Sequence, residues 1–167
     1  KLASSETGID FTNAVKWGDV IYYEDDRVLH GSGSHDLHKI DLKTKQISRI
    51  QTNDSNSKYA VSKILCADSN YLYYNYTYGV YALKLSDESY QKVSEDKGIR
   101  VFVYKDKAYM KLRDEDKYCI INGTKTPELV ENQLTALLLE EYDYGGFEYY
   151  TVGDYIVFYG SSCCVIY

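Results

Sequence analysis

Several features that mark common protein classes are missing from this chain of 167 residues. No apolar run reaches the roughly 18 residues that a membrane-spanning helix needs. The G-x-S-x-G motif of serine hydrolases is absent, and so is the cysteine spacing of zinc or redox sites. Lys and Arg number 19 against 25 Asp and Glu. Nucleic acids and anionic membranes favour a basic surface. We therefore expect neither nucleic-acid binding nor direct membrane insertion.

Four cysteines are present, and each lies in an apolar, strand-like stretch: Cys66, Cys119, Cys163 and Cys164. Two adjacent cysteines do not have the geometry of a C-x-x-C ligand pair. We expect buried free thiols that pack as small apolar side chains. The alternative is a disulfide that joins Cys66 or Cys119 to one of the adjacent pair. No residue pattern indicates a cofactor.

Proline is nearly absent, with 1 residue, whereas tyrosine is abundant, with 20. Tyrosine favours pleated, half-buried surfaces, so the composition indicates β structure. Apolar residues make up 44% and charged residues 26% of the chain, which is a globular and not a disordered composition. The length suits one domain. The chain begins at Lys1 and not at Met, so we expect it to be a piece of a longer protein with neighbouring domains.

A short turn followed by an aromatic-rich apolar run occurs four times along the chain. The copies are Gly18–Tyr23, Ser69–Tyr74, Lys105–Met110 and Gly153–Tyr159. Their first residues are 51, 36 and 48 positions apart, which is close to the roughly 40–50 residues of a propeller blade. This spacing predicts a repeat architecture.

Each copy is preceded by one further strand. The first three copies are followed by two short strands around a polar turn, and the fourth is followed by one strand, at Cys163–Tyr167. The preceding strands are predicted at Phe11–Trp17, Ser62–Ala67, Ile99–Tyr104 and Phe147–Val152. In the third repeat, Asn122-Gly123 is a strong hairpin signal, because both residues accept positive φ. The sequence thus predicts four antiparallel meanders, at 11–52, 60–95, 99–131 and 147–167, with a short helix or loop inserted at 132–146.

The strands differ in their expected burial. In the first repeat, the alternation of Leu37, Lys39 and Asp41 with the residues between them predicts a half-exposed strand. In the second repeat, the nearly continuous run Tyr71–Tyr78 predicts a strand that is covered on both faces. Stacked meanders would supply that cover.

The strings "GDVIYYEDDRVLHGSGSHDLHKIDLKTKQI" and "SNYLYYNYTYGVYALKLSDESYQKV" resemble the repeats of bacterial β-propellers of the PQQ-like and YWTD-like types. The resemblance implies an all-β, propeller-type domain of about four blades, either complete in itself or part of a larger propeller. It implies a binding or scaffolding role and no particular reaction. The Tyr-Trp-Thr-Asp tetrad and a quinone-ligand pattern are both absent, and Trp17 is the only Trp.

Metal sites have weak candidates in this sequence. His30, His35 and His38 lie within nine positions, but their spacing matches no known metal motif, and we expect no metal there. The acidic pairs Asp25-Asp26 and Asp114–Asp116 are more simply explained as solvated turns than as calcium ligands.

The best candidate ligand-binding residues are Tyr142, Asp143, Tyr144 and Phe147. They combine aromatic rings, a carboxylate and glycines in the expected insertion, and loops carry function more often than cores do. We interpret the chain as a non-catalytic binding or sensor module for a protein or glycan ligand, at the cell surface or outside the cytoplasm. The alternatives are a propeller-fold hydrolase or lyase with carboxylates or histidines in its channel, and a structural repeat segment of a larger surface protein.

Overall fold

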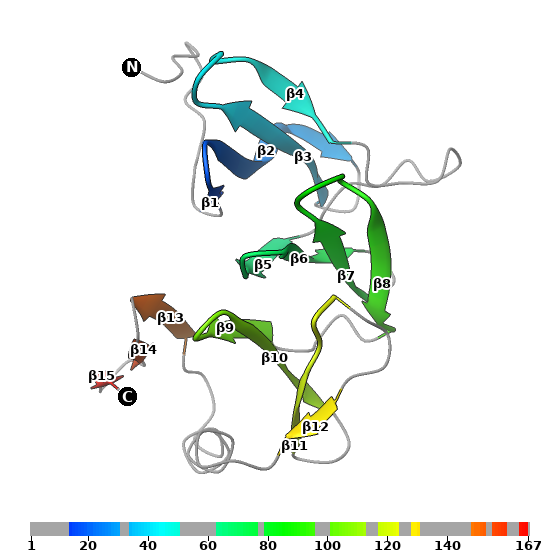
Figure 1. Ribbon diagram of the computed structural model, residues 1–167. Helices are drawn as coiled ribbons and strands as arrows, with labels where there is room; N and C mark the ends of the chain where they lie inside the picture. The colour runs from blue at the N-terminus through cyan, green and yellow to red at the C-terminus, as the bar shows by residue number, and fades with distance from the viewer. Residues whose placement is uncertain are drawn as a thin grey trace.

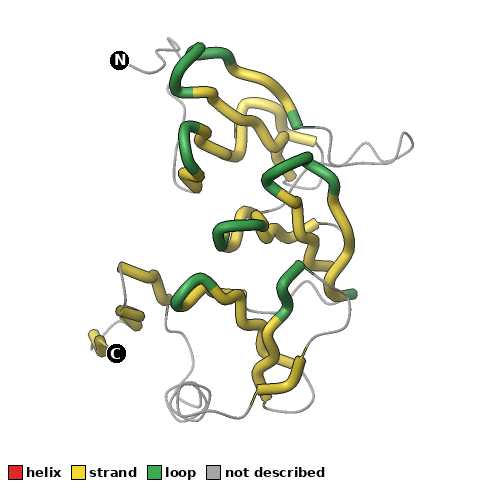
Figure 2. The backbone as a smooth tube through the Cα atoms, viewed as in Figure 1, coloured by secondary structure: helices red, strands yellow, loops and turns green. Residues whose placement is uncertain are grey.

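The computed structural model describes residues 14–30, 34–50, 63–76, 79–95, 101–112, 117–123, 128–130, 148–152, 155–159 and 164–166. Over these ranges the backbone consists of strands, turns and short loops, and none of it is helical (Figure 2). Accordingly, no described segment is a long apolar helix of the kind that crosses a membrane. The predicted all-β class is confirmed for this part of the chain.

The strands form four antiparallel sheets, and in every sheet the spatial order of the strands is their order in the sequence. Sheet 1 contains β1 (Ala14–Trp17), β2 (Val20–His30), β3 (Ser34–Asp41) and β4 (Ile47–Arg49). Sheet 2 contains β5 (Lys63–Ala67), β6 (Tyr71–Tyr76), β7 (Gly79–Lys84) and β8 (Tyr90–Ser94). Sheet 3 contains β9 (Val101–Tyr104), β10 (Lys107–Leu112), β11 (Lys117–Ile120) and β12 (Glu128–Val130). Sheet 4 contains β13 (Glu148–Val152), β14 (Tyr155–Tyr159) and β15 (Cys164–Ile166). The predicted meanders of three or four strands are therefore present.

The four sheets follow one another along an open arc (Figure 1). The first strands β1, β5, β9 and β13 lie on its inner side, whereas β4, β8 and β12 lie on its outer side. Contacts between sheets run mainly through these first strands, with β1 next to β5, β5 next to β9 and β9 next to β13. Figure 1 shows an arc and not a closed ring.

Sheet 2 is covered on both faces, because its side chains alternate between two cores. On β6, Leu72 and Tyr74 pack toward sheet 1, in a core that includes Tyr22 and Leu37. Tyr73, which lies between them, packs toward sheet 3. All three β6 side chains are at most 1% exposed. The prediction that this tyrosine-rich strand is covered on both sides is confirmed, although the strand ends at Tyr76.

Sheets 1 and 3 also bury side chains on both faces. In sheet 3, Phe102 is stacked on Tyr109, with ring centroids 5.3 Å apart, on the face opposite to the core shared with sheet 2. In sheet 1, Leu37 and Ile40 occupy opposite faces of β3, and each is 1% exposed. The expectation of a half-exposed β3 was therefore wrong. The sequence pattern places the charged residue Lys39 on the same face as Leu37, which predicts that this face is exposed. In the structure Leu37 is buried and Lys39 is half-buried.

The hairpin turns use positive φ at different positions. Gly18 alone is in the left-handed region between the paired residues Trp17 and Val20, as in a type II′ turn. Lys105 and Asp106 both have positive φ between β9 and β10, as in a type I′ turn. Each turn holds its two strands in a tight hairpin.

The turn at Asn122-Gly123 has the predicted positive φ angles, 31° and 66°. However, the ladder between β11 and β12 begins at the pair Ile120 and Glu128. The connection is thus longer than the two-residue hairpin that the dipeptide suggested. The predicted insertion at 132–146 lies outside the described residues.

Candidate functional site

Three turns between first and second strands lie side by side and are joined by hydrogen bonds. They are the turns at 18–19, 68–70 and 105–106, which we call the turn face. The indole Nε1 of Trp17 donates to the carbonyl oxygen of Ser69 at 2.7 Å. The backbone N and Oγ of Ser69 donate to the Asp106 carboxylate at 2.6 and 2.5 Å. Ser69 therefore links the edges of sheets 1, 2 and 3.

The turn face also carries aromatic rings. Trp17 precedes the first turn, Tyr71 follows the second and Tyr104 precedes the third, and all three are half-buried. Lys105 places its Nζ 5.1 Å from the centroid of the Tyr104 ring. Three half-buried rings thus belong to the residues that flank these turns, next to the hydroxyl of Ser69 and the carboxylate of Asp106.

The buried carboxylate of Asp68 holds the middle turn, at 68–70, through hydrogen bonds to its backbone. Its Oδ1 accepts hydrogen bonds from the backbone N–H groups of Asn70 and Tyr71, at 2.8 and 2.7 Å. Its Oδ2 accepts one from the hydroxyl of Tyr73 at 2.9 Å, and that hydroxyl accepts one from the backbone N–H of Gly123 at 3.0 Å. The buried carboxylate is thus fully engaged, and the chain of hydrogen bonds ties sheet 2 to sheet 3.

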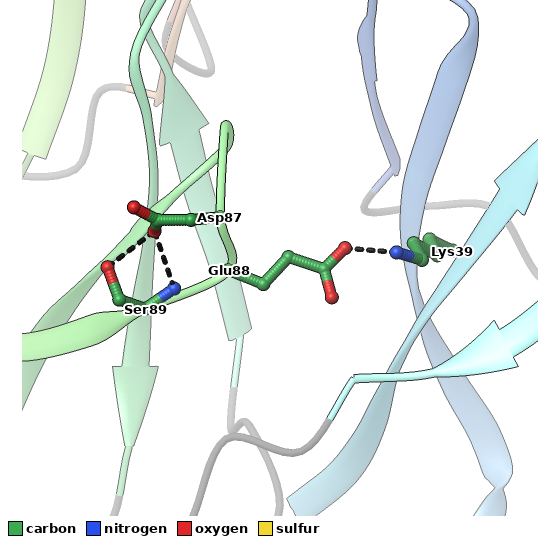
Figure 3. A network of polar contacts seen from close by, with 4 residues as sticks. All are labelled: Lys39, Asp87, Glu88 and Ser89. Atoms are coloured by element: carbon green, nitrogen blue, oxygen red, sulfur yellow. Dashed lines mark hydrogen bonds and ion pairs between the residues drawn. The ribbon is translucent and has the colours of Figure 1, made fainter.

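Another polar contact joins sheets 1 and 2 through the turn between β7 and β8. Glu88 adopts a φ of 59° and forms an ion pair with Lys39 of β3 (Figure 3). Beside it, Asp87 accepts hydrogen bonds from the backbone N and Oγ of Ser89, at 3.0 and 2.6 Å (Figure 3). The side chains of Lys39 and Glu88 are 30% and 33% exposed. We therefore assign the pair an orienting role and little net stability.

Burial controls the titration of the groups between sheets 2 and 3. It raises the pKa of the Tyr73 hydroxyl, and the nearby Asp68 carboxylate raises it further. The same two causes raise the pKa of the Cys66 thiol. Burial also raises the pKa of Cys119 to about 11. These groups are neutral at neutral pH and so are poor nucleophiles.

Cys66 and Cys119 are free thiols, so the alternative of a disulfide that includes either of them was wrong. Both pack in the core between sheets 2 and 3. The expectation of buried apolar thiols is confirmed for Cys119, and Cys66 is half-buried. The side chains of Cys163 and Cys164 lie outside the described part of the chain.

We expect Asp87 to contribute to stability only above acidic pH. The hydroxyl of Ser89, then its backbone N–H and then Lys84 lower the pKa of Asp87 from 3.8 to about 2. A lowered pKa stabilises the folded state above the pKa of the unfolded chain, and this contribution is lost as the pH falls through the folded value. The substitution Asp87→Asn should therefore flatten the dependence of unfolding free energy on pH between about 4 and 2. Urea denaturation at several pH values measures it, and an unchanged slope would contradict the expectation.

Of the three candidate histidines, the structure describes the side chain of His38 alone. The ring of His38 lies against Tyr23, with ring centroids 5.7 Å apart. For His30 and His35 only the backbone is described, in β2 and β3. Among the side chains that are described, no group of three His, Cys, Asp or Glu is placed to hold a metal ion. The side chains of Asp25, Asp26 and Asp114–Asp116 are outside that set.

The predicted ligand-binding residues Tyr142, Asp143, Tyr144 and Phe147 also lie outside the described residues, so their role stays a prediction. The turn face was missed as a site at the sequence level. Its signal was present in the recurring pairs Gly18-Asp19, Ser69-Asn70 and Lys105-Asp106, which were interpreted only as turns. The adjacency of these pairs depends on the stacking of sheets and not on any local pattern.

Neither a protein-family model nor a curated protein matches this chain.

Proposed function

We propose that this protein is a non-catalytic binding module of propeller type that recognises a glycan through its turn face. The observation that carries the proposal is the continuous hydrogen-bonded link from Trp17 through Ser69 to Asp106. It fixes three turns of different sheets into one surface. Half-buried rings next to fixed polar groups suit a sugar, whose apolar face stacks on a ring while its hydroxyls form hydrogen bonds.

The propeller type is supported by how the sheets are stacked. Four-stranded meanders with their first strands adjacent along the inner side of an arc are the arrangement of propeller blades. A four-bladed or larger propeller would place the turns at 18–19, 68–70 and 105–106 around one end of its channel. Binding residues are found disproportionately on loops that a rigid scaffold positions.

A binding role is favoured over hydrolase or lyase chemistry by the composition of the inner strands. Acid–base catalysis needs convergent carboxylates or histidines. Among the described first strands, β1, β5 and β9 contain none, and β13 contains Glu148. We place the module at the cell surface or outside the cytoplasm, next to further domains of a longer chain. The free thiols of Cys66 and Cys119 are compatible with this location, because both pack in the core between sheets 2 and 3.

Trp17 offers a direct test, because it is the chain's only Trp and lies on the turn face. We expect a soluble glycan selected from an array to shift the emission of Trp17. The substitution Asp106→Ala removes the two hydrogen bonds that hold Ser69 in the turn face. Since hydrogen bonds to a charged group contribute roughly 1.5–3 kcal/mol, it should weaken binding by about 10- to 150-fold. The control is Glu95→Gln, at the exposed end of β8 and away from the inner turns.

If no glycan binds, the glycan proposal is wrong, and if a glycan binds Asp106→Ala and Glu95→Gln equally well, the turn face is not the recognition surface. Binding of a protein with the same dependence on Asp106 would assign the surface to a protein ligand. Absence of any ligand would favour the structural-segment role, which the open arc also suits.

A further inference from the structure

We propose that Asn122 is a site of spontaneous deamidation, and that its rate is set by how often the junction between sheets 2 and 3 opens. Asn122-Gly123 is the one Asn-Gly pair in the sequence. Glycine has no side chain to hinder its main-chain nitrogen as it approaches the preceding asparagine side chain. Asn122 is exposed to solvent, whereas Gly123 is buried against sheet 2. This inference does not depend on the ligand of the turn face.

The chemistry needs only water. The main-chain nitrogen of Gly123 loses its proton to solvent and forms a bond to Cγ of Asn122. The bond between Cγ and Nδ2 breaks, and the nitrogen leaves as ammonia after taking a proton from water. Water then opens the cyclic imide at either carbonyl, which yields an aspartyl or an isoaspartyl residue. A water molecule is consumed, ammonia is released, and no atom changes its oxidation state.

The closed junction blocks the first step. The N–H of Gly123 donates to the hydroxyl of Tyr73 at 3.0 Å, and that hydroxyl donates to Asp68 at 2.9 Å. The hydroxyl proton of Tyr73 is therefore donated to Asp68, and the hydroxyl oxygen of Tyr73 accepts the hydrogen bond from the N–H of Gly123. Loss of that proton would create an anion next to a buried carboxylate, which a low-dielectric environment opposes.

Steric contact holds the same nitrogen in place. A Cβ built on Gly123 would lie 2.4 Å from the ring of Tyr71, so the main chain of Gly123 sits directly on that ring. Asn122 and Gly123 are both held at positive φ by the turn. The nitrogen becomes free to attack only when the turn leaves Tyr71 and Tyr73, that is, when sheets 2 and 3 separate locally. The observed rate is then the open fraction multiplied by the rate in the open chain.

The products would oppose closing. Either product carries a carboxylate in place of the Asn122 amide, in a turn that is hydrogen-bonded toward Asp68 through Tyr73. The isoaspartyl form also adds a methylene to the main chain, which displaces the Gly123 nitrogen from the Tyr73 hydroxyl. Each opening that leads to reaction therefore leaves an aspartyl or isoaspartyl residue at position 122, which does not revert to asparagine.

The test compares deamidation of the folded protein, of the denatured chain and of variants, by mass mapping of the peptide that contains Asn122. We expect the folded wild type to react far more slowly than the chain in guanidinium chloride. The substitution Tyr73→Phe removes the acceptor and should speed the reaction about tenfold, the effect of losing roughly 1.4 kcal/mol of hydrogen bonding. The variant Asn122→Gln should lose the signal, which identifies the site.

Val93→Ala is the matched control, because Val93 is 6% exposed in the same core and takes no part in the hydrogen-bonded chain. It loosens the junction while Tyr73 keeps its hydroxyl, so it should also accelerate deamidation, in proportion to the unfolding free energy that it loses. The proposal is overturned if the folded wild type reacts as fast as the denatured chain. It is also overturned if neither Tyr73→Phe nor Val93→Ala reacts faster than the wild type. The first comparison stands even if Tyr73→Phe does not fold.

Discussion

Replacement of Gly79 by alanine should cost about 2–5 kcal/mol of unfolding free energy, the sum of left-handed backbone strain and overpacking. Gly79 has a φ of 133° at the start of β7. A Cβ there would lie 1.8 Å from the carbonyl oxygen and 2.9 Å from the carbonyl carbon of Ser94. Both atoms belong to the backbone of β8, so no side chain can rotate away to make room.

Gly18→Ala is the matched control for this experiment. Gly18 also has positive φ, 54°, but a Cβ there would meet no atom within 4 Å. Only backbone strain applies, so we expect a loss of about 1 kcal/mol. Urea denaturation of both variants measures the difference, with midpoint shifts interpreted at a common m-value. Equal losses would show that the approach of Ser94 to Gly79 does not constrain the fold.

Phe102→Ala should be comparably severe, with an expected loss of about 3–5 kcal/mol. Phe102 is 2% exposed. Its ring is stacked on Tyr109 and meets the edge of Tyr118, with centroids 5.8 Å apart in the second pair. Truncation removes apolar burial and both ring contacts at once, and the rings that remain lie on neighbouring strands of the same sheet.

Two controls separate packing from a general effect of substitution. Phe102→Leu keeps most of the volume and loses the ring contacts, so it should cost about 1–2 kcal/mol. Ile47→Ala changes a side chain that is 47% exposed on β4 and should stay within about 1 kcal/mol of wild type. The expectation fails if Phe102→Ala resembles Ile47→Ala, since this face of sheet 3 would then not be a packed core.

The strand pattern could be predicted from the sequence because it depends on local chemistry. Turn residues such as Gly18 and Asn122 stand next to apolar runs, and the tyrosines of β6 leave no polar face for solvent. The expected first strand at 62–67 matches β5 closely, as the expected strand at 99–104 matches β9. The burial of β3 was mispredicted, because Lys39 is half-buried by pairing with Glu88 of another sheet.

The candidate site was much less predictable, because its contacts join residues far apart in the chain. The hydrogen bond from Gly123 to Tyr73 spans 50 positions, and that from Trp17 to Ser69 spans 52. Neither end of such a pair contains information about the other. The three clustered histidines match no metal motif, and the one ring among them that the structure describes packs on Tyr23.

The double-sided burial of β6 has a consequence for how this strand finds its alignment. In a strand with one solvent-exposed face, a slip of one residue would move the apolar side chains into solvent. The hydrophobic effect therefore specifies the register of such a strand. Both faces of β6 are buried, so Leu72, Tyr73 and Tyr74 would stay buried after such a slip. The hydrophobic effect therefore does not select the register of this strand. Sheet 2 contains two register shifts, between Ile64 and Cys66 and between Val80 and Tyr81. Irregularities of this kind fix the pairing of neighbouring strands, so we expect these two to set the register of sheet 2.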